Sequence, residues 1–216
     1  LLSGKPLLGH AIETALACQS LNSVIVSTDD EEIAHVAQQY GAETPFMRPK
    51  NLAQDDSPEW LSWRHALRSL SKIDDNPHID ILVIIPTTAP LRSVADVEAC
   101  ITLIQENTCD GVITVTPGKR SPHFNMITLS RSGHASLAIP PSEPISVRQS
   151  APVVYDMTTV AYAVKSQFVL ESQDLFEGKI QAVIVPAERA LDIDSELDLE
   201  YAEFLLRRQV ALQLEP

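Results

Sequence analysis

Apolar and polar positions follow two different periods along the chain. Apolar residues recur every three or four positions in five stretches, the spacing of helices with one buried face. These predicted helices cover residues 6–19, 31–40, 57–70, 94–105 and 196–212. Between them lie short apolar, β-branched runs that are typical of buried strands. The predicted strands cover residues 23–27, 81–85, 111–115, 154–164 and 180–185, with a further short strand at 44–47.

Strands and helices that alternate in this way indicate an α/β fold. The continuous apolar run at 81–85 is expected of a central parallel strand that is covered on both faces. We therefore predict a three-layer, doubly wound, mostly parallel sheet. Ligands of such sheets bind beyond the carboxyl ends of the strands, which directs attention to the loops at 28–30, 86–92 and 116–119.

The alternation stops between residues 119 and 153. This stretch is rich in proline, serine and arginine and has only two short candidate strands, at 125–129 and 136–139. A long insertion of this kind in a compact domain usually serves function or contacts between subunits. We predict one domain, residues 1–216, with an arm at about 119–153.

Composition narrows the classes of partner. A net charge of −13 over 216 residues argues against binding a nucleic-acid polymer, whose phosphates the protein would repel. No apolar run is long enough to cross a membrane. Cys18, Cys100 and Cys109 have no metal-ligand spacing, so we expect reduced thiols and a cytoplasmic protein.

A candidate metal site lies between the last predicted strand and the last predicted helix. Asp192 and Asp194 are two residues apart, so in an extended segment their carboxylates point to the same side. Two hard oxygen ligands suit Mg²⁺, which completes its shell with water and substrate phosphates. The alternative is a helix start, with Ser195 as N-cap and Asp198 three residues later.

The loop after the strand at 81–85 carries a second candidate site. Hydroxyls of Thr87 and Thr88 can donate hydrogen bonds, two prolines stiffen the loop, and Arg92 supplies a permanent cation. The alternative is a rigid turn whose Ser93 caps the next helix.

These residues resemble motifs of the CMP–sialic acid synthetase family, which comprises acylneuraminate and related cytidylyltransferases. Thr88 to Arg92 is similar to the end of the family's P-T-[SA]-P-L-R segment, and Asp192 to Asp198 to its D-I-D-x-x-x-D ending. Further similar stretches occur in the same order, namely Gly4 to His10, Val26 to Asp30, Arg48 to Ser57, and Arg148 with Gln149. The resemblance spans nearly the whole chain.

The resemblance implies transfer of CMP from CTP to a nonulosonic acid, an acidic nine-carbon sugar, with release of pyrophosphate. Asp192 and Asp194 would hold Mg²⁺ or Mn²⁺ as catalytic residues. Arg48, Thr88 and Arg92 would contact the nucleotide or shape its loop, although Arg92 can equally be structural. The arm would join two protomers in a homodimer.

The sequence departs from the family at the amino terminus. The family's glycine-rich, lysine-bearing phosphate loop, which follows its first strand, is absent, and the chain opens with Leu1. We expect that strand and loop to lie upstream, in a longer chain, and we expect residues 1–216 alone to fold and turn over poorly.

The residues that would bind the sugar acceptor also differ from those of the family. Asp156 stands where the family has arginine, Thr158 where it has asparagine, and Pro86 where it has glutamine; Tyr162 is kept. A carboxylate in place of a cation reverses the local charge, so we expect a modified sugar, with Asp156 reading an amine, amide or hydroxyl. A turn residue without ligand contact is the alternative for Asp156.

Cations on the acceptor side complete the predicted site. Arg148 is expected to pair with the sugar carboxylate and Gln149 to line the site. Lys119 is expected to hold or steer the anion, unless it is simply solvated. Two other functions stay open: a nucleotidyltransferase of this fold that uses another nucleoside triphosphate or a sugar 1-phosphate, and a non-catalytic nucleotide- or sugar-binding homologue.

Overall fold

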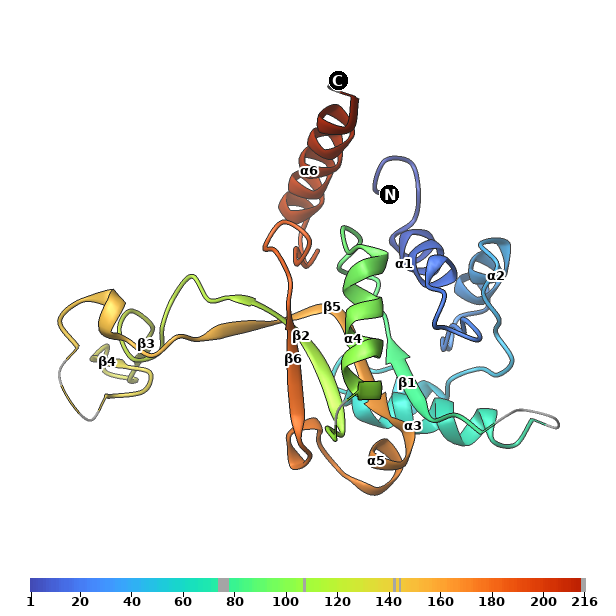
Figure 1. Ribbon diagram of the computed structural model, residues 1–216, viewed down its shortest axis with the longest axis horizontal. Helices are drawn as coiled ribbons and strands as arrows, with labels where there is room; N and C mark the ends of the chain where they lie inside the picture. Colours follow the sequence, from blue (N-terminus) through green and yellow to red (C-terminus); the bar gives the residue numbers. More distant parts are fainter. Residues whose placement is uncertain (74–77, 107, 142, 144, 215–216) are drawn as a thin grey trace.

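A sheet covered by helices on both faces forms the body of the protein (Figure 1). The computed structural model describes residues 1–216 except 74–77, 107, 142, 144 and 215–216, and except the side chains of 148 and 210–214. The sheet has the strand order β1 (Ile81–Ile84), β5 (Tyr155–Lys165), β2 (Gly111–Pro117), β6 (Ile180–Ile184). Helix α4 (Val94–Glu106) covers one face, and α3 (Glu59–Leu70) with α5 (Ser166–Glu171) covers the other. The predicted three layers are present.

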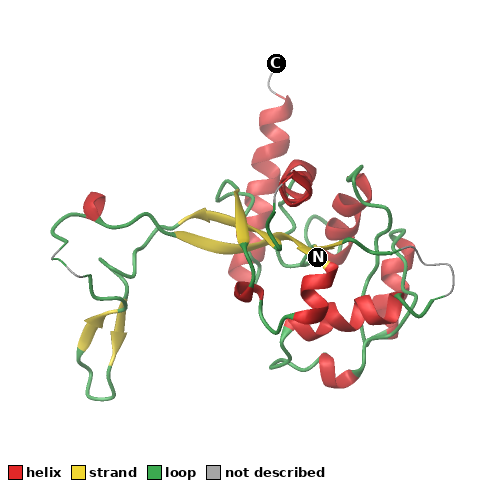
Figure 2. Cartoon of the chain, turned by 60° about the horizontal axis from the view of Figure 1, so that its bottom comes forward, coloured by secondary structure: helices red, strands yellow, loops and turns green. Residues whose placement is uncertain are grey.

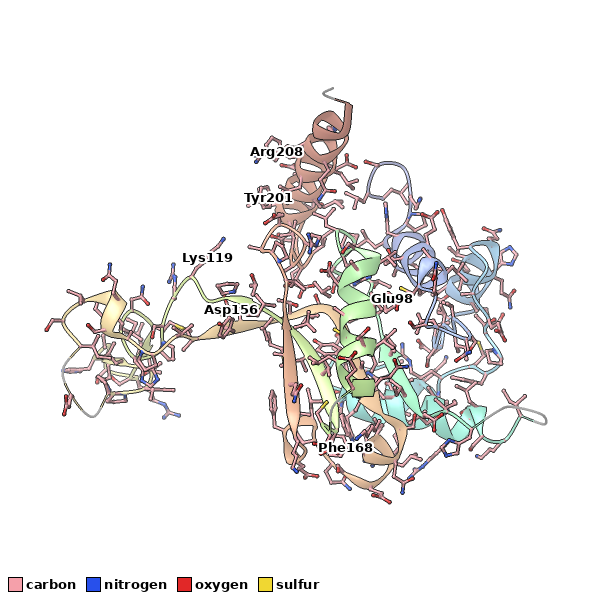
Figure 3. All side chains as sticks on the ribbon, in the orientation of Figure 1. Glu98, Lys119, Asp156, Phe168, Tyr201 and Arg208 are labelled. Atoms are coloured by element: carbon pink, nitrogen blue, oxygen red, sulfur yellow. The ribbon has the colours of Figure 1, made fainter. Side chains whose placement is uncertain are left out.

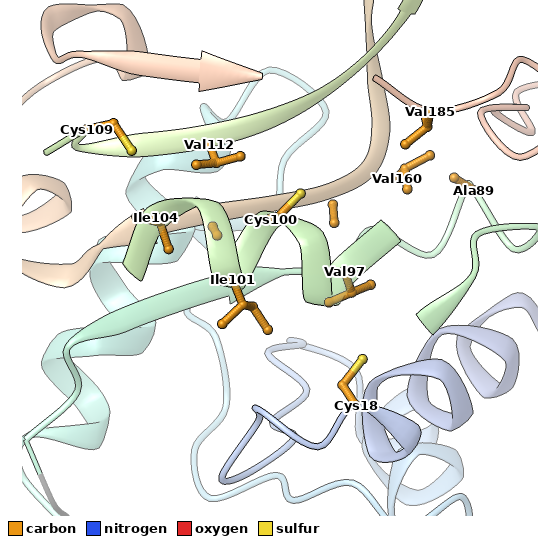
Figure 4. Packing of buried hydrophobic residues seen from close by; sticks show 12 residues of the cluster. Cys18, Ala89, Val97, Cys100, Ile101, Ile104, Cys109, Val112, Val160 and Val185 are labelled. Atoms are coloured by element: carbon orange, nitrogen blue, oxygen red, sulfur yellow. The ribbon is translucent and has the colours of Figure 1, made fainter. Parts of the chain in front are cut away.

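Successive side chains of a strand point to opposite faces of the sheet, which explains why helices cover both faces. Val112 of β2 points to α4 and packs with Val97 and Ile104, whereas the next residue, Ile113, points to α3 and packs with Trp60. Figure 4 shows the α4 side, where side chains from successive helix turns meet those of the sheet. Burial of these apolar side chains is the main source of stability, at roughly 25 cal/mol per Å² of apolar surface.

The expectation of a mostly parallel sheet is corrected, because the sheet is mixed. β2 and β6 pair in parallel, but β5 lies between β1 and β2 and is antiparallel to both. The chain leaves the sheet at the end of β2, runs through the arm and returns into β5 at the same end, where Tyr155 pairs with Pro117. β1 is consequently an edge strand of the described sheet and not a central one.

The predicted strand at 23–27 forms only in part. Ile25 and Glu43 make an isolated parallel bridge, supported by hydrogen bonds from Val26 N to Glu43 O at 2.9 Å and from Glu43 N to Val24 O at 2.8 Å. The prediction of a strand at 44–47 is wrong, since this pairing takes place at Glu43. Among the described residues, this bridge is the only β pairing of the segment.

The predicted helices are confirmed with small shifts of their ends. The remaining ones are α1 (Leu7–Ala17), α2 (Glu31–Gln39) and α6 (Glu196–Leu214), with short 3₁₀ turns η1 (Lys50–Leu52) and η3 (Leu175–Glu177). Gly41 ends α2 with φ of +94°, a conformation that costs glycine nothing. None of the described helices is both long and apolar enough to be a membrane span.

The arm and α6 both project from the body (Figures 1 and 2). The arm carries a two-stranded hairpin of β3 (Ile127–Leu129) and β4 (Ala135–Leu137), followed by the 3₁₀ turn η2 (Arg148–Ser150). Helix α6 leaves the sheet at the point where the arm also begins, so the two enclose an angle. Two of the expected features, the insertion and the closing helix, therefore meet at one end of the sheet.

Candidate functional site

The segment that holds Asp192 lies directly against the loop after β1. The backbone N–H of Ile193 donates to the carbonyl of Thr88 at 2.8 Å. Leu191 and Ile193 pack with Leu91 in one apolar cluster. These contacts hold Asp192 at the carboxyl end of the sheet, where ligands of α/β folds bind.

The carboxylate of Asp192 has the properties of a cation ligand. Its Oδ1 atom is buried and has no hydrogen-bond partner among the described residues. A buried carboxylate oxygen without a partner is costly, and a bound cation removes that cost. Burial lowers the pKa of Arg92 and raises that of Tyr162, and the negative charge of Asp192 acts to raise both, which places the two side chains near it.

Asp194 lies on the same extended segment, with its side chain exposed to solvent. The predicted helix cap coexists with the candidate metal pair. Ser195 Oγ donates to Asp198 Oδ2 at 2.6 Å, and Ser195 N donates to the same oxygen at 2.9 Å. Asp198 is thus used by the cap of α6, which leaves Asp192 and Asp194 for other partners.

Among the residues that the structure describes, no group of three or more His, Cys, Asp or Glu side chains is arranged to hold a metal. The donor set of Asp192 and Asp194 fits Mg²⁺, which needs only one or two protein carboxylates.

A third carboxylate, Glu59, lies near Asp192 and was not predicted. Glu59 opens α3, with Pro58 at the N-cap position. Glu59 is exposed as a residue, yet burial of its carboxylate end raises its pKa, with Arg48 acting in the opposite direction and Asp192 in the same direction. An acidic residue in the first turn of a helix is so common that sequence alone carries no signal of this role.

Arg92 connects the loop after β1 to strand β5 through side-chain hydrogen bonds. The residue is 5% exposed. Its Nε donates to the carbonyl of Val160 at 2.7 Å and its Nη2 to that of Thr159 at 3.3 Å, with a further bond to Pro86 O. Burial lowers its pKa to about 10, although Asp192 and Asp96 act in the opposite direction. Its Nη1 is buried without a partner among the described residues, so one donor is left over for a ligand.

The carbonyls that Arg92 binds come from an irregularity in β5. The pairing with β2 shifts between Ile113 and Thr114, which leaves residues 159–161 of β5 out of register. Thr114 Oγ1 accepts a hydrogen bond from Ala161 N at 3.1 Å and one from Thr158 Oγ1 at 2.8 Å. The Thr158 hydroxyl is therefore bound inside the sheet. Bulges of this type often re-aim side chains at functional sites.

Tyr162 and Arg48 lie on the α3 side of the site. Tyr162 is buried against Trp63, with ring centroids 5.8 Å apart, and burial, helped by Glu59 and Asp192, raises its pKa to about 12. The backbone N–H of Arg48 donates to the Thr28 carbonyl at 2.8 Å, which joins the predicted ligand loop at 28–30 to the segment that carries Arg48. Arg48 Nε is buried without a partner in the described part of the chain.

The described side chains line a pocket of about 760 Å³ between the sheet, the loop before Asp192 and α6. This volume is in the range of small-molecule sites. Lys119, Asp156, Thr158 and Asp192 are predicted site residues that line it. Tyr201 and Arg208 of α6 line it too and were missed, since the apolar pattern that predicts the helix does not show what its exposed residues face. In Figure 3 both lie on the side of α6 that is turned toward the root of the arm, where Lys119 and Asp156 are labelled.

The other predicted acceptor residues are elsewhere. Arg148 and Gln149 belong to η2 in the arm, and Gln149 does not line the described pocket. Gln149 is exposed, and the side chain of Arg148 lies outside the described residues. Thr88 and Pro86 contribute their carbonyls, to Ile193 N and Arg92 respectively.

Comparison with known proteins fits this geometry. A family model described as cytidylyltransferase matches residues 1–122. The post-translational flagellin modification protein B of Campylobacter coli is 32% identical over 203 residues, which cover 94% of this chain and 85% of the relative. The chain belongs to the cytidylyltransferase family.

Other relatives are consistent with this assignment. CMP-N,N'-diacetyllegionaminic acid synthase of Campylobacter jejuni is 32% identical to this cytidylyltransferase over 200 residues, which cover 93% of the chain and 83% of the relative. A solved structure of CMP:2-keto-3-deoxy-manno-octonic acid synthetase complexed with CTP superposes with a TM-score of 0.68 and 16% identity, covering 97% and 90% of the two chains. The fold is that of nucleotidyltransferases, and the protein is an enzyme similar to the acylneuraminate cytidylyltransferases.

Proposed function

We propose that this cytidylyltransferase transfers CMP from CTP to the anomeric hydroxyl of a nonulosonic acid. The sugar oxygen forms a bond to the α-phosphorus, the bond from that phosphorus to the bridging oxygen of the β-phosphate breaks, and pyrophosphate leaves with the electron pair. The hydroxyl proton passes to solvent. Relatives at 32% identity support this substrate class, since one is named for making a CMP-linked acidic sugar. The cytoplasm, which holds CTP, is the compartment that we propose.

The observation that carries the proposal is the hydrogen bond from Ile193 N to Thr88 O. It joins the predicted metal segment to the predicted nucleotide loop, which are more than 100 positions apart in the sequence. We propose that Asp192 and Asp194 hold Mg²⁺ or Mn²⁺ there. The ion would neutralise phosphate charge as a Lewis acid.

The chain's own residues then position and neutralise the substrates. Arg48 Nε and Arg92 Nη1 are buried donor atoms without a partner among the described residues, and both are suited to triphosphate oxygens or nucleotide hydroxyls. Asp156 lines the same pocket as Asp192, which supports the proposal that the acceptor enters there. Positioning and charge neutralisation of this kind are the main means of catalysis in phosphoryl transfer.

The arm supports a homodimer as part of the proposal. Its exposed apolar side chains are too many for a segment that stays in water. They include Ile127, Leu129, Ile139, Val147 and Val153, each at least 50% exposed. We propose that a second copy of the chain covers them.

A pyrophosphate-release assay with the full-length protein tests the function. CTP, UTP, GTP and ATP are each supplied with Mg²⁺ and either N-acetylneuraminate or N,N'-diacetyllegionaminic acid. The expected result is release with CTP only, together with a CMP-sugar product seen by mass spectrometry. Release with another nucleotide would favour a different nucleotidyltransferase, and binding of CTP without turnover would favour a non-catalytic homologue.

A further inference from the structure

The pocket beside Asp192 has two unlike walls. One wall is the sheet, where the end of β2 and the start of β5 present Thr116 and Asp156. The other wall is one face of α6. Its lining residues recur every three or four positions, as one helix face requires, and they are Tyr201, Leu205, Arg208 and Gln209. Neither CTP nor metal binding, as proposed above, makes use of this helix face.

Packing fixes the position of this helix face. Leu205 is 6% exposed and packs with Ala202 and Leu91, so α6 is held on the same loop that carries Arg92. Tyr201 is 51% exposed and stacks on Phe204, with ring centroids 6.3 Å apart and an interplanar angle of 12°. A half-exposed ring that lines the pocket and stacks on its neighbour presents an apolar surface to a ligand.

The charges of the pocket show which group each wall can bind. Arg189 lines the pocket, but Asp96 already binds its guanidinium at 2.8 and 2.9 Å. Arg208 has no ion pair or hydrogen bond among the described residues, and its side chain is exposed. On the sheet side Asp156 and Asp192 are acidic, while Lys119 at the root of the arm and Glu188 before Asp192 add one charge of each sign to the lining. An anionic group of a ligand is therefore attracted to the α6 wall, and hydrogen-bond donors are attracted to Asp156.

We propose that α6 forms one wall of the acceptor site, in which Arg208 binds the carboxylate of the sugar and Tyr201 covers its apolar substituents. Asp156, across the pocket, accepts a hydrogen bond from an N–H or O–H of the same sugar. A guanidinium can hold a carboxylate with two parallel hydrogen bonds. A tyrosine ring face suits the methyl of an N-acyl group or a deoxy carbon. The ligand class is an acidic sugar with N-acyl or deoxy substituents, and the inference rests on the proposed function.

Steady-state kinetics of full-length variants at saturating CTP test the inference, with N-acetylneuraminate and N,N'-diacetyllegionaminic acid as acceptors. Arg208→Ala is expected to raise the KM for the better acceptor about tenfold or more, as loss of a charged hydrogen bond does, with the KM for CTP unchanged. Tyr201→Ala is expected to raise it severalfold and to narrow the difference between the two sugars, whereas Tyr201→Phe keeps the ring and stays near wild type.

Arg207→Ala is the matched control. Arg207 is the neighbouring cation on α6, pairs with Glu203, and does not line the pocket. Its variant should keep the wild-type KM for the sugar. Equal sugar KM values for wild type and Arg208→Ala would overturn the inference and leave the proposed function intact. If the wild-type protein transfers CMP to neither sugar, the proposed function falls, and the inference falls with it.

Discussion

The guanidinium of Arg189 donates two hydrogen bonds to the carboxylate of Asp96. The bonds run from Nε to Oδ2 at 2.8 Å and from Nη2 to Oδ1 at 2.9 Å. Asp96 also accepts from Ser93 N at 2.9 Å and thereby caps the start of α4. The pair ties the loop before Asp192 to the helix after Arg92, so it holds both halves of the site in place.

Arg189→Ala should destabilise the fold. The Asp96 side chain is 6% exposed and would lose its counter-ion, which costs several kcal/mol for a fully buried pair. Arg189 is 33% exposed, so solvent screening reduces the expected loss in free energy of unfolding to about 1–3 kcal/mol. Urea unfolding measures it. Glu13→Gln, which removes the exposed partner of Lys5, is the control and should lose little, and an equal loss in both variants would contradict the assigned role of the pair.

Asp96 should also make stability depend on pH. Burial acts to raise the pKa of its carboxyl, but hydrogen bonds from Arg189 and Ser93 outweigh it, and the pKa lies below the ordinary value of 3.8. Because the pKa is lowered in the folded state, the stabilisation is present above about pH 4 and is lost as the pH falls through the folded pKa. The advantage of wild type over Asp96→Asn in urea unfolding should therefore shrink between pH 5 and about pH 3. A constant difference over that range would exclude this linkage.

Asp194→Asn should lower Mg²⁺-dependent turnover by about two orders of magnitude or more, since it removes a metal ligand while its exposed side chain contributes nothing to the core. Circular dichroism should show an unchanged fold. Asp198→Asn, which alters only the cap of α6, should keep most of the activity. The metal assignment fails if Asp194→Asn keeps both turnover and metal optimum.

Glu59→Gln should raise the Mg²⁺ concentration needed for half-maximal turnover severalfold, because it removes a negative charge close to Asp192. In the wild-type protein the Mg²⁺ concentration for half-maximal turnover should rise as the pH falls toward the raised pKa of Glu59. In the variant this rise should be smaller. Metal titrations of activity at two pH values measure both effects. Identical titrations for the two proteins would remove Glu59 from the site.

Leu129→Lys should convert a dimer to a monomer. Leu129 is 68% exposed on β3 of the arm, and a charge at that position opposes burial against a second copy. Light scattering coupled to size exclusion measures the mass. Ile33→Lys, at a 45% exposed position on α2, is the control and should remain dimeric. A wild-type monomer at micromolar concentration would exclude the arm as a dimer contact.

The sequence by itself determined the helices, most of the strands and the candidate loops. Periodicity places α2 and α4 within one or two residues because one face of each is apolar, a local property. The cap formed by Ser195 and Asp198 is equally local, as are the order of the motifs and the family resemblance that they carry.

Only the tertiary structure decided how distant segments meet. The antiparallel place of β5 follows from the route of the chain through the arm, and the burial of Arg92 follows from the shift in β5, neither of which leaves a periodic signal. Glu59 of α3 lies near Asp192, and Tyr201 and Arg208 of α6 line the pocket beside it, although these helices are far apart in sequence. Contacts between remote residues depend on the packing of the whole chain, whereas helices and caps depend on neighbours within a few positions.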